Sequence, residues 1–357
     1  MRPGRGRILV AALDLPAGSL VFSERPLVVA TAATTGDAAL RGEAQAVALA
    51  LLQQRQEGAF LLCSPSLGEG SAEAKSFAAA ADRFAAACPE HDGRLARHWL
   101  GVASVNVHAA ERPTRGVMGL LSSMMEHNCS PSCMVTVGPE AGGSVVSLRT
   151  CRAVTAGESL SISYVVAYQP TATRRQQLLS QHGFLCGCAR CADGPDLTRC
   201  FVCPNCGDAP CSPTSSLTAC RTLACTDCGP MTLDGEAWGR LLAAEDSSDM
   251  GDAMRHLHPY HHKMVAMYRA NIGKVPIANG QRAEVYCQFA DARIRLTSNP
   301  LDALAAADLE RAGVSFRAAG DVHSAARLFE SAGSGFAAHF GEDSPEAARC
   351  KQALAML

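Results

Sequence analysis

The sequence predicts an α+β protein with a cysteine-rich segment and a helical C-terminal part. Strand signals, in which short apolar stretches are bounded by turns, occupy residues 8–29 and return from Val117 to Tyr164. Between these regions, residues 38–100 are rich in alanine and show helical spacing. After about residue 236 the pattern is helical to the end. The chain is therefore expected to combine strands and helices, with a cysteine-dense segment at residues 186–228 before the helical tail.

The individual elements can be placed in order along the chain. Residues 8–29 read as two short strands, Ile8–Val10 and Leu20–Phe22, around the turn Pro16-Ala17-Gly18. The helical region is interrupted by a loop over residues 64–71. Further strands are expected at residues 135–137, 145–148 and 159–164, with a hairpin turn at Gly142-Gly143 and a short helix at residues 174–181.

The helical tail contains two amphipathic stretches separated by Ala319-Gly320-Asp321. The first carries apolar residues from Leu301 to Phe316, and the second carries them from Val322 to Phe336. Such a pair is typical of one unit of a tetratricopeptide-like (TPR-like) array, and an ordinary helical hairpin is the alternative.

Composition limits the class of protein. With 357 residues the chain can hold two or three compact units. A hydrophobic fraction of 48% is typical of globular proteins, and the formal charge of −2 gives no general attraction to nucleic acid or anionic membrane. Asp14 and Pro16 interrupt the apolar start, and no stretch approaches the roughly 20 apolar residues of a membrane span. We expect a soluble, intracellular protein of the cytoplasm and/or nucleus, with no direct nucleic-acid or membrane partner.

Seventeen cysteines, an odd number clustered at short spacing, favour metal ligation over a disulfide framework. Cys186, Cys188 and Cys191 offer three thiolates within six residues. A structural zinc site needs four ligands in a tetrahedron, so a fourth ligand must come from elsewhere in the fold. Spacing alone leaves three candidates for this ligand, which are Cys129, Cys133 and Cys200.

A second cysteine group has the spacing of a four-cysteine zinc ribbon. Cys203 and Cys206 form one pair, Cys225 and Cys228 form the other, and eighteen residues separate the pairs. A glycine follows each pair, which lets the backbone turn and direct amides at the sulfurs. Four thiolates leave no open coordination position, so the predicted zinc ion is structural rather than catalytic. A redox-active Cys-x-x-Cys pair is the weaker alternative.

Other reactive residue types have plainer expected roles. The four histidines between residues 256 and 262 are interpreted as a partly exposed helix start, and Glu158 as a turn residue rather than a catalytic acid. No Ser/His/Asp order, Walker loop or paired-carboxylate pattern stands out. Cys211 and Cys220 stay undecided, and five further cysteines are expected to be buried apolar fillers: Cys63, Cys88, Cys151, Cys287 and Cys350.

Four segments carry motifs in order along the chain. The first is the glycine-rich start Gly4-Arg5-Gly6-Arg7 followed by Ala17-Gly18. The second is Glu126-His127-Asn128-Cys129-Ser130-Pro131, and the third runs from Gly157 to Tyr164. The fourth runs from Arg174-Arg175 through Phe184 to Cys186-x-Cys188-x-x-Cys191. Together these segments, which cover about residues 1–30 and 100–192, resemble the SET domain of SMYD-type (SET-and-MYND) protein-lysine methyltransferases. The second is similar to the family's NHSCxPN, the third to its GEELxISY and the fourth to its post-SET tail.

This resemblance implies a β-clip-like SET domain with a helical insertion, in which the C-terminal strands thread through a loop as a pseudoknot. S-adenosylmethionine would enter one face of a narrow channel and the substrate lysine the other, and Tyr164 would be the catalytic residue that orients the amine. The positions that match the family's cofactor contacts are Arg5, Gly6, Arg7, Asn106, Glu126, His127, Tyr164 and Phe184. By the same resemblance Cys129 completes the site of Cys186, Cys188 and Cys191, so that with Cys203, Cys206, Cys225 and Cys228 two zinc ions are expected.

The chain departs from the family pattern in three places. No MYND zinc finger interrupts residues 27–100, Glu126 stands where the family has asparagine, and His182 stands where a tyrosine is usual. Three functions therefore remain open. The first is a protein-lysine N-methyltransferase that acts on histone or non-histone proteins. The second is a catalytically impaired SET-fold scaffold that binds protein partners through its helical tail, and the third is a zinc-ribbon binding module.

The expected domain order follows from these assignments. Residues 1–35 would be the N-terminal part of the SET domain, residues 36–100 the helical insertion and residues 101–185 the SET core. Residues 186–232 would form the zinc-bound post-SET and ribbon-like segment, and residues 233–357 the TPR-like helical C-terminal domain.

Overall fold

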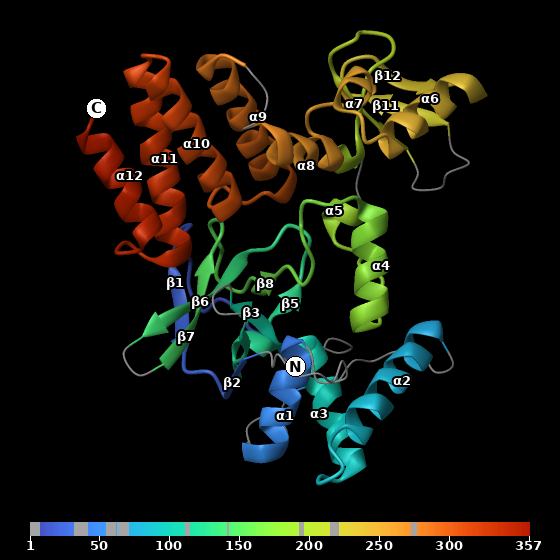
Figure 1. Ribbon diagram of the computed structural model, residues 1–357, viewed down its shortest axis with the longest axis vertical. Coiled ribbons are helices and arrows are strands. Elements are labelled where there is room, and N and C mark those ends of the chain that lie inside the picture. The colour runs from blue at the N-terminus through green and yellow to red at the C-terminus, as the bar shows by residue number, and fades with distance from the viewer. Residues whose placement is uncertain are drawn as a thin grey trace. The chain divides into compact units, whose positions relative to one another are not determined.

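The computed structural model of the protein consists of two compact units (Figure 1). The first unit contains Met1–Val165 and Arg175–Cys186, and the second contains Val166–Arg174 and Gly187–Leu357. Among the described residues, no helix combines the length and hydropathy of a membrane span. The residues that the structure describes are 8–31, 42–54, 62, 71–110, 115–140, 143–192, 196–214, 221–272 and 277–357.

Short strands of the first unit form three small sheets. Two of them have three antiparallel strands each, in the orders β1-β7-β6 and β2-β4-β3, whereas β5 and β8 pair in parallel. A core that includes Leu148, Val154 and Leu160 packs against residues of β1, β6, β7 and β8. The strands are β1 Leu20–Glu24, β2 Val28–Thr31, β3 His108–Ala110, β4 Arg115–Met118, β5 Glu126–His127, β6 Cys133–Glu140, β7 Gly143–Thr150 and β8 Ser161–Ile162.

The strand expected at Leu20–Phe22 is confirmed within β1, whereas the strand expected at residues 159–164 is confirmed only at Ser161–Ile162, which form β8. Residues 135–137 and 145–148 lie inside β6 and β7. The strand expected at Ile8–Val10 is wrong in extent, because only Val10 makes a bridge there, to Ser159. Gly142 of the expected hairpin turn lies outside the described residues. Glu158 is confirmed as a turn residue, since its main-chain amide donates to the Thr155 carbonyl at 3.1 Å.

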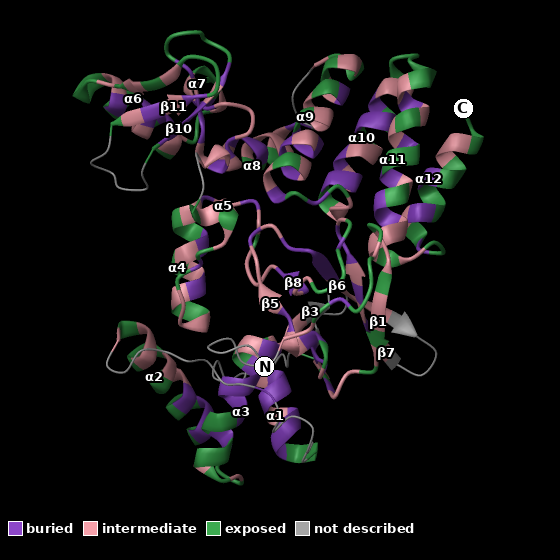
Figure 2. Ribbon diagram, turned by 180° about the vertical axis from the view of Figure 1, so that it is seen from behind, coloured by how far each residue is buried: buried purple, intermediate pink, exposed green. Residues whose placement is uncertain are grey.

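Three helices form the first region predicted to be helical, α1 (Glu43–Gln54), α2 (Ala72–Ala86) and α3 (Gly93–Asn106). Ser71 and Asp92 begin α2 and α3, because their side-chain oxygens accept hydrogen bonds from amides of the first turn. The helices bury one face around Trp99, Phe84 and Leu51. Figure 2 shows buried stretches along α1 and α3. Burying each such side chain contributes about 1.5–3 kcal/mol. Most of the loop expected at residues 64–71 lies outside the described residues.

The predicted short helix is α4 (Thr171–His182), which begins in the second unit and ends in the first. The cysteine-dense segment that follows forms an antiparallel sheet in the order β12-β11-β10-β9. Phe201, Leu223 and Trp238 lie in one core that joins this sheet to the helices after it. The elements are α5 Ala189–Ala192, β9 Phe201–Val202, β10 Pro210–Pro213, β11 Thr222–Cys225, β12 Gly229–Thr232, α6 Gly235–Asp246, α7 Met250–His256 and α8 His262–Asn271.

The helical tail is confirmed as four further helices, α9 (Asn279–Thr297), α10 (Ala303–Ala318), α11 (Val322–Phe340) and α12 (Pro345–Ala355). The two predicted amphipathic stretches are α10 and α11, and the residues predicted to separate them form the connection. Asp321 begins α11 by accepting a hydrogen bond from Ser324 N. Phe329 and Phe336 of α11 are buried. The TPR-like character of this tail stays a prediction.

The histidine-rich segment is confirmed as a helix start with His256, His258 and His262 partly exposed, and it departs from the sequence interpretation at His261 alone. His261 does begin a helix, since its Nδ1 accepts a hydrogen bond from Lys263 N at the start of α8. It is fully buried rather than partly exposed, because its Nε2 lies 3.4 Å from a carboxylate oxygen of Glu245. The same carboxylate receives two hydrogen bonds of 2.7 Å each from the guanidinium of Arg199. The ion pair between Arg199 and Glu245, which lie on distant segments, therefore holds the turn at His261 inside the second unit.

The stability contributed by Glu245 is expected to decline as the pH falls. Burial alone would raise the pKa of Glu245, but the hydrogen bonds from Arg199 and His261 lower it to about 2. When the pKa of a carboxyl group is lower in the folded state, the group stabilises the fold fully at a pH above its unfolded-state pKa, which is about 4.3 for glutamate. This contribution is lost as the pH falls through the folded-state pKa. Between pH 6 and pH 3 the free energy of unfolding should lose about 2 kcal/mol relative to Glu245→Gln, measured by urea denaturation.

The matched control is Glu236→Gln on the same helix, α6. Glu236 pairs with Arg240 four residues on, and its side chain is 86% exposed. An exposed pair of this kind contributes little, so the difference between the native chain and Glu236→Gln should stay nearly constant with pH. A constant difference for Glu245→Gln as well would contradict the interpretation.

Candidate active site and metal centres

A short parallel pair brings two distant segments side by side. Glu126 of β5 faces Ser161 of β8, and His127 faces Ile162. The pairing is extended by a hydrogen bond of 3.0 Å from Asn128 N to the Ile162 carbonyl. Beyond it, the buried hydroxyls of Ser132 and Ser161 each accept the main-chain amide of the other residue, at 2.9 and 3.1 Å. These reciprocal bonds fix the register, so the residues on either side meet in a defined geometry.

Tyr164, two residues past the end of β8, is held by both ends. Its amide donates to Nδ1 of His127 at 3.0 Å, and its hydroxyl donates to the main-chain carbonyl of Met125. Because Nδ1 accepts, a neutral His127 ring carries its proton on Nε2. That nitrogen lies 3.3 Å from Sγ of Cys129. The imidazole thus links the tyrosine to a candidate metal ligand.

Four rings form a contiguous aromatic cluster, which consists of His127, Tyr164, His182 and Phe184. The ring centroids of Tyr164 and His182 lie 4.7 Å apart, and those of His127 and Tyr164 lie 5.3 Å apart. Phe184 completes the cluster at 6.0 Å from His127 and 6.3 Å from His182. All these separations fall in the range of favourable ring contacts. Burial lowers the pKa of His182, so its ring is neutral near pH 7.

The turn between His182 and Phe184 has a local cause. Gly183 adopts φ = 77°, a left-handed conformation that costs glycine little and ends helix α4. The chain then reverses, and Phe184 packs against the same rings as His182. Sequence reasoning placed Phe184 at the cofactor and noted His182 only as a departure from the family, whereas the structure puts both in the cluster.

Of the other predicted cofactor residues, the structure describes Asn106 and Glu126. Asn106 is buried at the end of α3, where its side-chain amide donates to the Val102 carbonyl at 2.7 Å. Its main-chain carbonyl accepts a bond from the Ser123 hydroxyl, two residues before Met125. Glu126 lies on β5 beside His127. Arg5, Gly6 and Arg7 lie outside the described residues.

The first candidate metal centre joins thiols from separate parts of the sequence. The Sγ atoms of Cys129 and Cys186 lie 3.9 Å apart in the first unit. Cys188 and Cys191 follow Cys186 within five residues of chain, so these four thiols form one set that could hold a metal ion. Cys133 and Cys200, the other two candidates from spacing, belong to neither group of thiols that could hold a metal among the described residues. Burial raises the pKa of both of these thiols.

A buried arginine that the sequence analysis named only as part of the post-SET resemblance lies beside this centre. Arg174 is fully buried, and its guanidinium lies 3.6 Å from Sγ of Cys191 and 3.0 Å from the Thr171 hydroxyl. The same group donates to the Gln169 carbonyl. A guanidinium beside a thiol favours the thiolate, which is the form that binds metal. The helical pattern around residue 174 gave no signal of this burial.

The second candidate centre has the predicted ribbon arrangement. The thiols of Cys203, Cys206, Cys225 and Cys228 form a second group that could hold a metal ion. Main-chain amides point at two of its sulfurs, Asn205 N at Cys203 and Asp227 N and Cys228 N at Cys225, over 3.3 to 3.4 Å. Gly207 and Gly229 have φ values of 78° and 79°, so the predicted role of these glycines in turning the backbone is confirmed.

The remaining cysteines are mostly apolar fillers, as expected. Cys88, Cys151 and Cys350 are about 1% exposed, and Cys287 is half-buried. Cys211 is buried and pairs across the sheet with Cys225, while its thiol lies 3.4 Å from the Phe201 carbonyl. Cys63 and Cys220 lie outside the described residues.

Comparison with known proteins connects this geometry to a family. Residues 6–165 match the model of the SET domain. The chain contains a SET domain. The matched region contains His127, Cys129 and Tyr164, and it ends at residue 165, before His182 and Phe184.

Two curated proteins that are similar to this chain carry the name histone-lysine N-methyltransferase. The chain is 26% identical over 190 residues to "Histone-lysine N-methyltransferase set5" of Schizosaccharomyces pombe, which covers 53% of this chain and 48% of that protein. It is 37% identical over 90 residues to "Histone-lysine N-methyltransferase SMYD3" of Mus musculus, which covers 25% of this chain and 20% of that protein. The chain therefore spans less than half the length of these relatives.

One solved structure aligns along nearly the whole chain, though loosely. It is titled "Crystal structure of the SET domain of LSMT bound to Lysine and AdoHcy" and covers 99% of this chain and 84% of that chain. With 12% sequence identity and a TM-score of 0.39, this alignment is too loose to support a conclusion on fold or ligand.

Proposed function

We propose that the protein is an S-adenosylmethionine-dependent protein-lysine N-methyltransferase of the SMYD type, without a MYND finger, that acts on histone or non-histone proteins. The observation that carries this proposal is the parallel pairing of β5 and β8, which puts His127 and Tyr164 in contact inside a SET domain. The names of the relatives, histone-lysine and N-lysine methyltransferases, support the same chemistry.

The residues present fit S-adenosylmethionine. Its sulfonium is a cation, and cations are attracted to the faces of aromatic rings such as the four of the aromatic cluster. The neutral His182 ring adds no opposing charge. When bound, the cofactor supplies an activated methyl group. The residues proposed to hold it are Arg5, Gly6, Arg7, Asn106, Glu126, His127, Tyr164 and Phe184.

Tyr164 is proposed to orient the amine of the substrate lysine. Its hydroxyl hydrogen is already donated to the Met125 carbonyl, so the phenolic oxygen offers only acceptor capacity to a substrate. An acceptor at this point can take an N–H of the amine and direct the nitrogen lone pair away from itself, toward the cofactor. Lysine has a free pKa of about 10.4, and a desolvated site favours its neutral, nucleophilic form. Positioning of this kind supplies much of the rate acceleration.

Two zinc ions are proposed to hold the surrounding chain in place. Cys129, Cys186, Cys188 and Cys191 would ligate one ion, and Cys203, Cys206, Cys225 and Cys228 the other. Four thiolates in a tetrahedral arrangement are typical of structural zinc. Since Cys186 lies two residues after Phe184, the first ion would fix this ring against His127. We also propose the domain limits given in the sequence analysis, a TPR-like character for the helical tail and a location in the cytoplasm or nucleus.

Ligand binding gives the first test. The full-length protein should be stabilised by S-adenosylmethionine, by about 2.7 kcal/mol at a concentration of 100 Kd, measured as a thermal shift. Transfer of labelled methyl groups to lysines of histones or of extract proteins should follow. No shift at millimolar cofactor would contradict the proposal. A shift without transfer to any protein would favour the alternative, an impaired SET-fold scaffold, for which His182 and Glu126 are the sequence arguments.

A further inference from the structure

Two of the four rings in the aromatic cluster are imidazoles, and they differ in their hydrogen bonds. Nδ1 of His127 accepts the Tyr164 amide at 3.0 Å, and its Nε2 lies 3.3 Å from Sγ of Cys129. The ring nitrogens of His182 have no hydrogen bond with any residue that the structure describes. A neutral imidazole carries one donor and one acceptor nitrogen. The ring of His182 therefore keeps an acceptor that the fold does not use.

This acceptor lies beside the tyrosine that is proposed to hold the substrate amine. The ring centroids of His182 and Tyr164 are 4.7 Å apart, and the ring planes are inclined by 36°. At such a separation a base can act on an amine at the Tyr164 oxygen directly or through one water. The phenol cannot take the proton itself, because it still carries its own hydrogen, which it donates to the Met125 carbonyl.

No charged group among the described residues shifts the pKa of His182, which burial alone lowers. Its two ring contacts are with uncharged rings. On β5, Glu126 precedes His127, and successive side chains of a strand point to opposite faces. Arg175, on the same helix as His182, donates to the Cys186 carbonyl. The ring of His182 is therefore neutral near pH 7, which is the form that takes up a proton.

A pocket of about 450 Å³ adjoins the end of α4 that carries His182. Helices α2, α3 and α4 line it, and two of its residues, Ser180 and Gln181, directly precede His182. The histidine itself is partly exposed. The polar lining residues, which offer hydrogen bonds to water, are Glu73, Ser76, Ser104, Ser180 and Gln181. The pocket therefore offers a proton on His182 a polar route to solvent.

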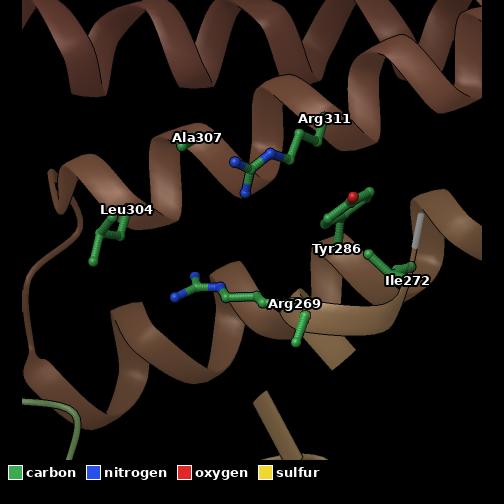
Figure 3. Close-up of a pocket in the computed structure, with 7 residues that line it drawn as sticks. Arg269, Ile272, Tyr286, Leu304, Ala307 and Arg311 are labelled. Atoms are coloured by element: carbon green, nitrogen blue, oxygen red, sulfur yellow. The ribbon is translucent and has the colours of Figure 1, made fainter. Parts of the chain in front are cut away.

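The pocket drawn in Figure 3 has no comparable group. It has a volume of about 500 Å³ and lies between α8, α9 and α10 of the second unit. Its titratable lining residues are Arg269, Tyr286 and Arg311, without a histidine or a carboxylate. Arginine and tyrosine side chains do not take up a proton near pH 7. The acceptor beside the substrate tyrosine is thus a feature of the first unit.

We propose that His182 is the general base of methyl transfer and takes one proton from the substrate ammonium while the Tyr164 oxygen holds a second N–H. This inference rests on the proposed function. The electron pair left on nitrogen attacks the methyl carbon, so that the N–C bond forms, the C–S bond breaks and its electron pair stays on sulfur. The proton passes from His182 to water, and the ring is neutral again for the next turnover. The products are a methylated ammonium, S-adenosylhomocysteine and one solvated proton.

The pH dependence of variants separates a base from a packing residue. His182→Phe keeps a ring against Tyr164 and Phe184 and removes the acceptor. Its rate of methyl transfer at pH 7 should be about 100-fold below that of the native chain. The deficit should shrink at pH 9.5, because closer to the free pKa of lysine, about 10.4, more substrate arrives as the neutral amine. His182→Tyr, which carries the residue usual in the family, should show the same deficit at pH 7.

The measurement uses the full-length protein, S-adenosylmethionine with a labelled methyl group, and core histones mixed with soluble extract proteins as acceptors. His258→Phe is the matched control, since the ring of His258 lies 4.8 Å from that of Tyr260 in the second unit and burial lowers its pKa too. This variant should keep the native rate at both pH values. The thermal shift by the cofactor should persist in all three variants.

The outcomes distinguish this inference from the function on which it rests. A native rate at pH 7 in His182→Phe or His182→Tyr would overturn the inference alone. A deficit that is equal at pH 7 and pH 9.5 would also overturn it, because a loss of packing does not depend on the charge of the substrate. Loss of the thermal shift in His182→Phe would assign the ring to cofactor binding instead. No transfer by the native chain would overturn the proposed function and this inference together.

Discussion

Cys225→Ser is expected to release one of two zinc ions per chain and to unfold the sheet β9 to β12. The sulfur of Cys225 belongs to the ribbon group and receives amides from Asp227 and Cys228, so its loss removes a ligand and leaves these donors without an acceptor. The sheet is made of strands of two to four residues, too short to be stable by themselves. Structural zinc contributes about 10–16 kcal/mol in zinc-finger peptides, so three remaining ligands cannot hold the fold.

Zinc content by elemental mass spectrometry and hydrogen exchange of residues 196–232 measure this outcome. Cys211→Ser is the matched control, because Cys211 faces Cys225 across the sheet and is equally buried yet outside the thiol group. It should keep two ions per chain and the protected amides. Two ions in Cys225→Ser would contradict the ribbon assignment, and one ion in Cys211→Ser would show that Cys211 is a ligand.

Tyr164→Phe is expected to lower kcat for methyl transfer about 100-fold while changing KM for the cofactor little. The substitution keeps the ring in contact with His127 and His182 and removes only the oxygen proposed to accept the amine. Loss of one positioned group of this kind costs about 10²–10³ in rate. Because the Met125 carbonyl also loses its donor, the variant should be less stable by about 1–3 kcal/mol.

The effect on stability can be separated from the effect on turnover. Tyr168→Phe makes the same chemical change at a tyrosine whose hydroxyl donates to the Tyr260 carbonyl at 2.6 Å, within the second unit. It should lose stability to a similar degree and keep its kcat. Equal losses of kcat in the two variants, measured where both are folded by circular dichroism, would refute a catalytic role for Tyr164.

Local patterns predicted the helices and the ribbon well. The apolar periodicity of residues 301–336 is a property of neighbouring residues, and α10 and α11 follow it closely. The ribbon is equally local, since each Cys-x-x-Cys-Gly carries both its ligands and its positive-φ glycine. The zinc ions themselves stay a prediction.

Contacts between distant segments could not be read from spacing. Cys129, Cys133 and Cys200 are equivalent in spacing, and only the fold puts Cys129 beside Cys186. The burial of Arg174 and His261 depends on partners such as Cys191 and Glu245, which no periodicity around these residues reveals. The resemblance to a known family selected Cys129 among these three cysteines, because the family's motifs reflect contacts between distant segments that local patterns do not show.

The pairing of β5 with β8 also sets the order in which the site can form during translation. About 35 residues separate Glu126 from its partner Ser161, and Cys186 follows later still. At about 5–20 residues per second, β5 leaves the ribosome roughly 2–7 seconds before β8 does. Through that interval its main-chain groups face water or chaperones, and a nascent chain that stops before residue 162 has the described helices α1 to α3 but lacks the strand pairing that brings Tyr164 to His127.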